Sequence, residues 1–137
     1  MVHMERAVYR DPEQDLRALW WELVERFQWV RRPEGRNAPD WAAKIHFSLA
    51  PAYYQNYLLG EMLASQLQGH ILGTVLGGAP DRWERFVSDP AVGAYMKHDL
   101  YVAGRRWNWR ELVRRATGRP LEPGPFIDDL AGRTAGA

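Results

Sequence analysis

The sequence predicts an all-α protein. No segment alternates apolar and polar residues as a half-buried strand does, whereas apolar residues recur at three- and four-residue steps in several segments. Hydrophobic residues make up 46% of the chain and charged residues 26%, a composition typical of a folded globular domain. We therefore expect about six helices around one long, buried helix over residues 51–76.

The first helix is predicted to follow the sequence Asp11-Pro12-Glu13-Gln14. Asp is a preferred N-cap residue, Pro fits the first helical position, and Gln three residues after the cap completes a capping box. An apolar stripe then runs from Leu16 to Val30. Residues 1–10 show little periodicity, and we expect them to be disordered or foreign to the native protein. Residues 31–39 are predicted to form a loop.

The longest helix is expected to begin at Pro51 and to continue to Leu76. It is apolar on most of its circumference, and such a helix is usually buried at the centre of a domain. The short segment before it, residues 41–50, is expected to be partly extended.

Shorter helices are predicted after the break at residues 77–80. They cover residues 81–87, a segment capped by Ser88-Asp89-Pro90 that ends near Gly104, a segment from Asn108 to Gly118, and residues 126–130. We expect a single domain over residues 11–131 and a flexible tail over residues 132–137.

Charge and composition exclude several classes of function. The chain has 18 basic and 17 acidic residues, a net charge of +1, which gives no electrostatic reason to expect nucleic acid or an anionic membrane as a partner. It has no cysteine, so disulfides, thiolate metal sites and cysteine nucleophiles are excluded. We expect no membrane span and no signal peptide in this chain, and the sequence leaves its compartment undetermined.

The sequence contains no recognisable metal-binding motif. The four histidines, His3, His46, His70 and His98, are never three or four residues apart on one predicted helix. There is also no His-Glu-x-x-His sequence and no acidic cluster at ligand spacing. We therefore expect no metal to be bound by this chain alone.

One group of residues has the chemistry of an anion-binding site. Residues two apart in an extended segment share a side, so Lys44 and His46 are expected to point the same way. On the helix that follows, Tyr57 shares a face with Tyr54 and with Tyr53, which precede it by three and four residues. Such donors at a helix start suit a carboxylate or a developing oxyanion. The alternative is that the tyrosines are core aromatics and His46 is an interior residue with its own polar partners.

Two stretches of the sequence resemble the carboxyl-terminal part of the angiotensin-converting-enzyme family of zinc peptidyl dipeptidases, within the wider gluzincin group of metallopeptidases. The first is LWWELVERFQ at residues 19–28, and the second is residues 43–57, with the sequence Ala-Lys-Ile-His followed by Pro51 and the tyrosines. A weaker likeness covers residues 109–120. The resemblance implies a fragment of a larger helical peptidase fold that releases dipeptides from peptide C-termini.

The resemblance also implies roles for individual residues. In that family a zinc ion activates the attacking water, and a Glu of the zinc motif acts as general base. A His and a Tyr donate to the oxyanion, while a Lys and a second Tyr hold the C-terminal carboxylate of the substrate. By motif position, His46 and Tyr57 would be the catalytic oxyanion donors, and Lys44 and Tyr54 would bind the substrate carboxylate.

The sequence departs from the family pattern in three ways. The gap between His46 and the tyrosines is one residue longer than in animal members, so Tyr53 and Tyr54 are both candidates for the carboxylate donor. Val24 and Asn56 replace chloride-binding arginines, so chloride activation is not expected. The zinc motif is absent, which implies that zinc is a cofactor of the parent enzyme and that this chain is inactive without a missing amino-terminal catalytic part.

Two further expectations follow from these patterns. A fragment of this kind would expose apolar area that the missing part covers, so we expect the isolated chain to form a homodimer. The alternative functions are a stand-alone helical module that binds a small anion or a partner protein, and a structural protein that oligomerises through its long helix.

Overall fold

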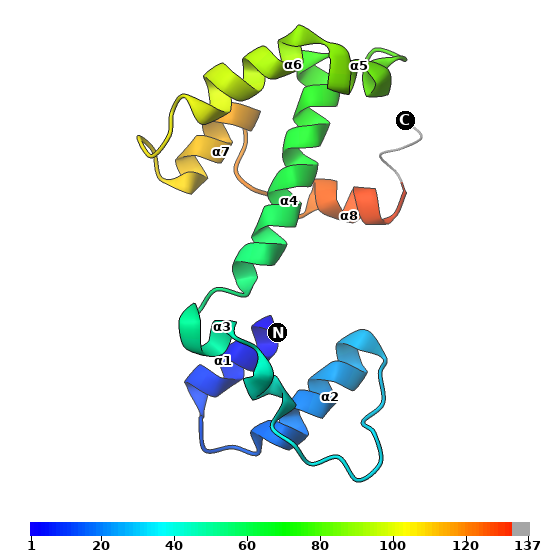
Figure 1. Cartoon of the computed structure of the whole chain (residues 1–137). Helices are drawn as coiled ribbons and strands as arrows, with labels where there is room; N and C mark the ends of the chain where they lie inside the picture. The colour runs from blue at the N-terminus through cyan, green and yellow to red at the C-terminus, as the bar shows by residue number, and fades with distance from the viewer. Residues whose placement is uncertain (133–137) are drawn as a thin grey trace. The chain divides into compact units, whose positions relative to one another are not determined.

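The computed structural model describes residues 1–132 and confirms the predicted all-α class (Figure 1). Eight α-helices, one 3-10 helix and two π-helical segments form the regular structure, and residues 1–132 contain no strand. Apart from Gly132, the tail expected over residues 132–137 lies outside the described residues.

The chain divides into two compact units, Met1–Leu58 and Leu59–Ala137. Each unit has a small core of its own, and the single domain expected over residues 11–131 stays a prediction. Met4 and Val24 are buried in the first unit, and a separate cluster around Ile71 and Leu72 is buried in the second.

The first unit begins with a helix that the sequence analysis did not predict. Helix α1 covers Val2–Arg10, where disorder was expected, and packs on α2, Leu16–Gln28. Met4 is fully buried and Glu5 is 3% exposed, so tertiary contacts hold this short helix in place. The 3-10 helix η1, Asp40–Ala43, packs on α2 as well, and the short helix α3, His46–Leu49, follows it.

Helix α2 starts later than its sequence signature predicts. Its N-cap is Asp15, whose carboxylate accepts hydrogen bonds from the backbone amides of Arg17 and Ala18 at 3.1 and 3.0 Å. Asp11 instead accepts from the amide of Glu13 at 3.1 Å, within the turn after α1. Both aspartates are good caps, and the turn that ends α1 decides between them.

The second unit contains the remaining helices. Its core consists of Ile71, Leu72, Leu76, Val92 and Tyr95. After α4 (Gln55–His70) and the segment that follows it, this unit contains α5 (Arg82–Ser88), α6 (Pro90–Tyr95), the π-helical segment η3 (Met96–Tyr101), α7 (Trp109–Thr117) and α8 (Gly124–Leu130).

The predicted caps of the second unit are confirmed. The Asp89 carboxylate accepts from the amide of Ala91 at 2.9 Å, and the Asn108 side chain accepts from the amide of Glu111 at 3.1 Å. Gly118 ends α7 with a φ of 76°, the left-handed conformation that favours glycine at this position.

The long helix differs from its prediction at its start and in its burial. Helix α4 covers Gln55–His70 and is followed by the π-helical segment η2, Ile71–Val75. Residues 51–54 are not helical, and Ala52 has a φ of 56°. The helix is not buried along its whole length: Gln66 is the buried residue of α4, while α5 and α6 pack on η2. Near its start Tyr57 and Leu58 are exposed.

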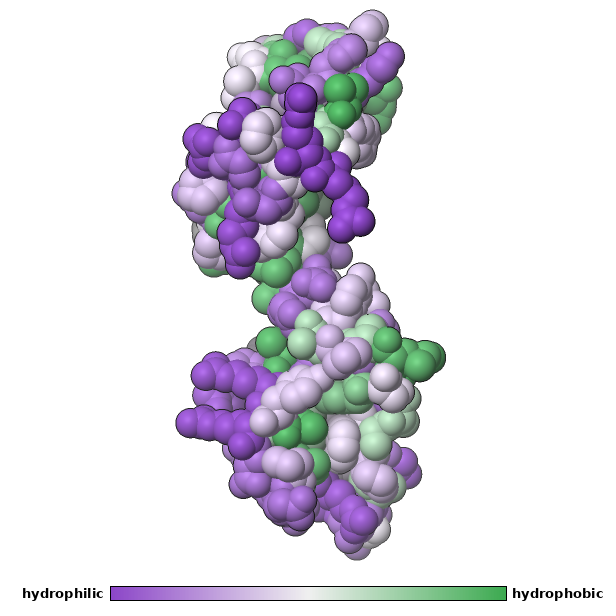
Figure 2. All heavy atoms as spheres, turned by 90° about the vertical axis from the view of Figure 1, so that its left-hand side faces the viewer, coloured by the Kyte–Doolittle hydropathy of each residue, from purple (hydrophilic) through white to green (hydrophobic). Residues whose placement is uncertain are grey.

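Many large apolar side chains remain at the surface. Figure 2 shows green, hydrophobic residues among purple, hydrophilic ones on the face in view. The most exposed are Trp29, at 90%, and Val87, at 87%. Within the described part of the chain, no helix has the length and apolar character needed to cross a membrane.

A buried amide joins α4 to the segment after α7. Gln66 is fully buried, and its Nε2 donates to Thr117 Oγ1 at 2.8 Å and to the carbonyl of Pro120 at 3.0 Å. Its Oε1 accepts from the backbone amide of Glu122 at 2.9 Å. A buried side chain that satisfies three partners fixes the path of the chain around it.

Replacing Gln66 should therefore destabilise the second unit. We predict that Gln66→Ala lowers the free energy of unfolding by about 1–3 kcal/mol, because it leaves buried partners without a hydrogen bond. The measurement is urea unfolding followed by circular dichroism. The matched control is Gln68→Ala on the same helix, whose side chain is half-buried. An equal loss in both variants would contradict the role of the Gln66 hydrogen bonds.

Candidate functional site

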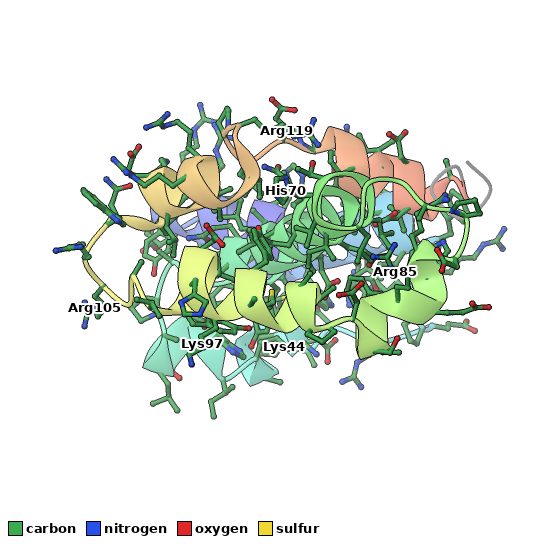
Figure 3. The ribbon with its side chains drawn as sticks, turned by 90° about the horizontal axis from the view of Figure 1, so that it is seen from above. Lys44, His70, Arg85, Lys97, Arg105 and Arg119 are labelled. Atoms are coloured by element: carbon green, nitrogen blue, oxygen red, sulfur yellow. The ribbon has the colours of Figure 1, made fainter. Side chains whose placement is uncertain are left out.

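The candidate site lies in the first unit, on the segment that connects η1 to the first turn of α4. This segment is more helical than predicted: Lys44 is extended, with φ −87° and ψ 109°, but Ile45 is helical and His46 begins α3. The strand-like alternation expected for Lys44 and His46 is therefore wrong. Lys44, which is labelled in Figure 3, is exposed and has no ion-pair partner among residues 1–132.

Four of the five predicted site residues form one aromatic cluster. The ring centroid of His46 lies 5.9 Å from that of Tyr53, 4.9 Å from that of Tyr54 and 5.5 Å from that of Tyr57. The residues come from α3, from the loop after it and from the first turn of α4. We name these four side chains the His–Tyr cluster.

A side-chain hydrogen bond joins two members of the His–Tyr cluster. Tyr57 Oη lies 2.8 Å from His46 Nε2. The ring planes are nearly perpendicular, at 80°. The side chains of Tyr53 and Tyr57 are 43% and 55% exposed, so solvent and small solutes reach this part of the cluster.

Tyr54 is half-buried, whereas Tyr53 and Tyr57 are exposed. Its ring lies 5.6 Å from that of Phe47, which in turn lies 5.4 Å from Trp41. Burial raises the pKa of Tyr54 above its usual value of 10.0, and the nearby charges of Glu5 and ionised Tyr57 raise it further. Its hydroxyl therefore remains a protonated donor at neutral pH.

The residue that organises this segment is one that the sequence analysis missed. The buried carboxylate of Glu5 accepts hydrogen bonds from two consecutive backbone amides, that of Tyr53 at 3.4 Å and that of Tyr54 at 3.3 Å. These amides follow Ala52, whose left-handed backbone turns the chain into α4. Glu5 thus fixes the turn that places both tyrosines beside His46.

The sequence carried only a weak signal for this contact. Met4, Ala7 and Val8 are spaced three and four residues apart, as on one helix face. However, no side chain caps the N-terminus of α1, and the amides that Glu5 binds are 48 and 49 residues away in the chain. Only the tertiary structure identifies that partner.

The chemistry of the site is that of hydrogen-bond donation to an anion. The three phenols and the imidazole carry O–H and N–H groups, and Lys44 adds a positive charge nearby in the sequence. Tyr53 and Tyr54 both contact His46, so the two candidates for the carboxylate donor both remain. Within residues 1–132 no group of three His, Cys, Asp or Glu side chains is arranged to hold a metal ion.

Comparison with known proteins gives no match. No family model, no curated protein and no solved structure is detectably similar to this chain. The geometry of the His–Tyr cluster and the two resembling stretches are therefore the observations on which a function can be proposed.

The role of Glu5 as a positioning residue can be tested by stability. We predict that Glu5→Ala lowers the free energy of unfolding of the first unit by about 1–3 kcal/mol, because two amides lose their buried acceptor. It should also change the NMR signals of the His46 and Tyr57 side chains, since the turn that holds them loosens. Denaturant unfolding and NMR spectra provide the two readouts.

The matched control for this prediction is Glu22→Ala on α2, where the glutamate is exposed. That variant should stay within about 0.5 kcal/mol of the wild type. If Glu5→Ala had no larger effect than Glu22→Ala on stability and left the His46 signals unchanged, Glu5 would have no positioning role.

Proposed function

We propose that this chain is the substrate-binding, carboxyl-terminal subdomain of a zinc peptidyl dipeptidase of the angiotensin-converting-enzyme type. The observation that carries the proposal is the 2.8 Å hydrogen bond between Tyr57 Oη and His46 Nε2. These are the two side chains that the sequence resemblance assigns as oxyanion donors. They are 11 residues apart in the chain, and both lie in an accessible cluster.

The proposed action of the pair follows from hydrogen-bond chemistry. Without a ligand, the side chains of Tyr57 and His46 are hydrogen-bonded to each other. A carboxylate or oxyanion beside them accepts from both groups when His46 carries its proton on Nε2, because each can then turn its donor to the anion. A donor of this kind typically contributes about 3–4 kcal/mol to stabilisation of an oxyanion.

Lys44 and one of the other tyrosines would supply the second part of the site. An exposed ammonium attracts the C-terminal carboxylate of a peptide, and the hydroxyl of Tyr54 or Tyr53 donates to the same group. The position of this second anion site relative to the first would determine which peptide bond lies next to His46 and Tyr57. This is how binding of a substrate end sets the site of cleavage.

The residues described here do not fit a zinc site of their own, because residues 1–132 contain no suitable group of ligands. The proposal therefore assigns the zinc ion and the general base to a catalytic part outside these residues. In the complete enzyme the zinc ion would activate the attacking water. This chain would bind and orient the peptide.

The exposed apolar side chains support the proposal that another polypeptide covers part of this chain's surface. Trp29 is the extreme case, because it is 90% exposed and takes a left-handed φ of 58° at the end of α2. Such a conformation is uncommon for a bulky residue, and exposed apolar patches often mark protein interfaces. In the proposed enzyme the catalytic part would cover this surface, and in isolation a second copy would do so.

Peptide binding is the direct test of the proposed function. We predict that the dipeptide glycyl-phenylalanine shifts the NMR signals of the side chains of Lys44 and of Tyr54 or Tyr53, whereas its C-terminal amide does not, because these donors bind the free carboxylate. Lys44→Ala should weaken binding at least about fivefold, since it removes a charge that attracts the carboxylate. Lys97→Ala is the matched control, as Lys97 is also exposed but lies on η3 in the second unit.

Two results would count against the proposal. One is equal binding of the dipeptide and its amide. The other is robust, chelator-sensitive release of a dipeptide from a blocked tripeptide by the isolated chain, because the proposal leaves this chain without zinc and without a general base. Binding of acetate as tightly as the dipeptide would favour the alternative function, a stand-alone module for small anions.

Self-association of the isolated chain is a separate prediction. We expect light scattering at micromolar concentration to give the mass of a dimer, because the exposed apolar side chains then become covered. Trp29→Ser should shift the equilibrium toward monomer, while Arg17→Ser on the exposed part of α2 should not. A monomer at these concentrations would contradict the prediction.

A further inference from the structure

Helix α1 carries a group of basic side chains on a different face from Glu5. His3, Arg6 and Arg10 are spaced three and four residues apart, so they share one side of the helix. Arg6 and Arg10 are exposed, and neither has a carboxylate partner among residues 1–132. Two permanently charged guanidiniums are therefore available to an external anion.

These three side chains line a cavity between α1 and α2. The cavity is open to solvent and has a volume of about 350 Å³. Leu19 and Leu23, one turn apart on α2, supply an aliphatic wall. No acidic side chain lines the cavity. We call it the α1–α2 cavity.

The walls of the α1–α2 cavity are held by contacts within the first unit. The His3 ring stacks on Phe27 of α2, with centroids 4.7 Å apart and planes 8° from parallel. Gln14 also lines the cavity, and its Nε2 donates to the carbonyl of Ala7 at 3.0 Å and to that of Asp11 at 2.6 Å. The cavity is thus formed by two packed helices and by the turn that joins them, which the Gln14 hydrogen bonds stabilise.

We propose that the α1–α2 cavity binds a small aliphatic carboxylate, with the carboxylate on Arg6 and Arg10 and the hydrocarbon chain against Leu19 and Leu23. Arginine suits this headgroup because its planar guanidinium makes paired hydrogen bonds to a carboxylate. The wall from α2 is aliphatic, and the His3 ring already stacks on Phe27, so the cavity favours a hydrocarbon chain over an aromatic ring. The site is distinct from the His–Tyr cluster and does not depend on its proposed function.

The probe for this proposal is octanoate, and the readout is a titration of the backbone amide NMR signals of residues 3–10 and 19–23. We expect saturable binding of octanoate, and binding at least tenfold weaker for acetate, which lacks the chain, and for octanol, which lacks the charge. The double variant R6Q/R10Q should weaken octanoate binding at least tenfold. Thermal unfolding of that variant verifies that it is folded.

Two matched variants complete the experiment. Arg17→Gln changes an exposed arginine of α2 that does not line the cavity, and Lys44→Ala removes an exposed lysine of the first unit that does not line it either. Both should bind octanoate as the wild type does. The proposal is overturned if octanoate shows no saturable binding, if octanol binds equally well, or if either control variant loses as much affinity as R6Q/R10Q.

Discussion

The arrangement of the first unit depends on one buried carboxylate. Glu5 accepts hydrogen bonds from the amides of Tyr53 and Tyr54, and an uncompensated charge at a buried position would be costly. The contact therefore stabilises both of the segments that it joins. It keeps α1 folded against the unit, and it fixes the turn from which the tyrosines reach His46.

This contact also explains why α1 has two different faces. One side of the helix holds the His–Tyr cluster in place through Glu5, while His3, Arg6 and Arg10 line the α1–α2 cavity. A helix of nine residues is marginal on its own in water, so both sites depend on its packing on α2. Both candidate sites of the first unit therefore depend on α1, a short helix that tertiary contacts keep folded.

Local signals in the sequence predicted much of the fold. The caps Asp89 and Asn108 and the terminating Gly118 act as expected, since the groups that they satisfy lie within a few residues. Non-local contacts decided two expectations that differed from the structure, the disorder of residues 1–10 and the burial of α4, whereas the turn that ends α1 decided that Asp15 is the N-cap of α2. The cluster of His46 with the three tyrosines could be predicted because the four residues lie within 12 positions. Glu5 could not, because its partners are about 50 residues away in the chain.

Hydrogen exchange at the amides of Tyr53 and Tyr54 tests the central role of Glu5 most directly. If the Glu5 carboxylate accepts from both, these amides exchange slowly in the wild type, although they lie in a loop. Both should exchange much faster in Glu5→Ala, while amides in the middle of α2 keep their protection. Fast exchange of the two amides in the wild type, or equal exchange in the two proteins, would contradict this account.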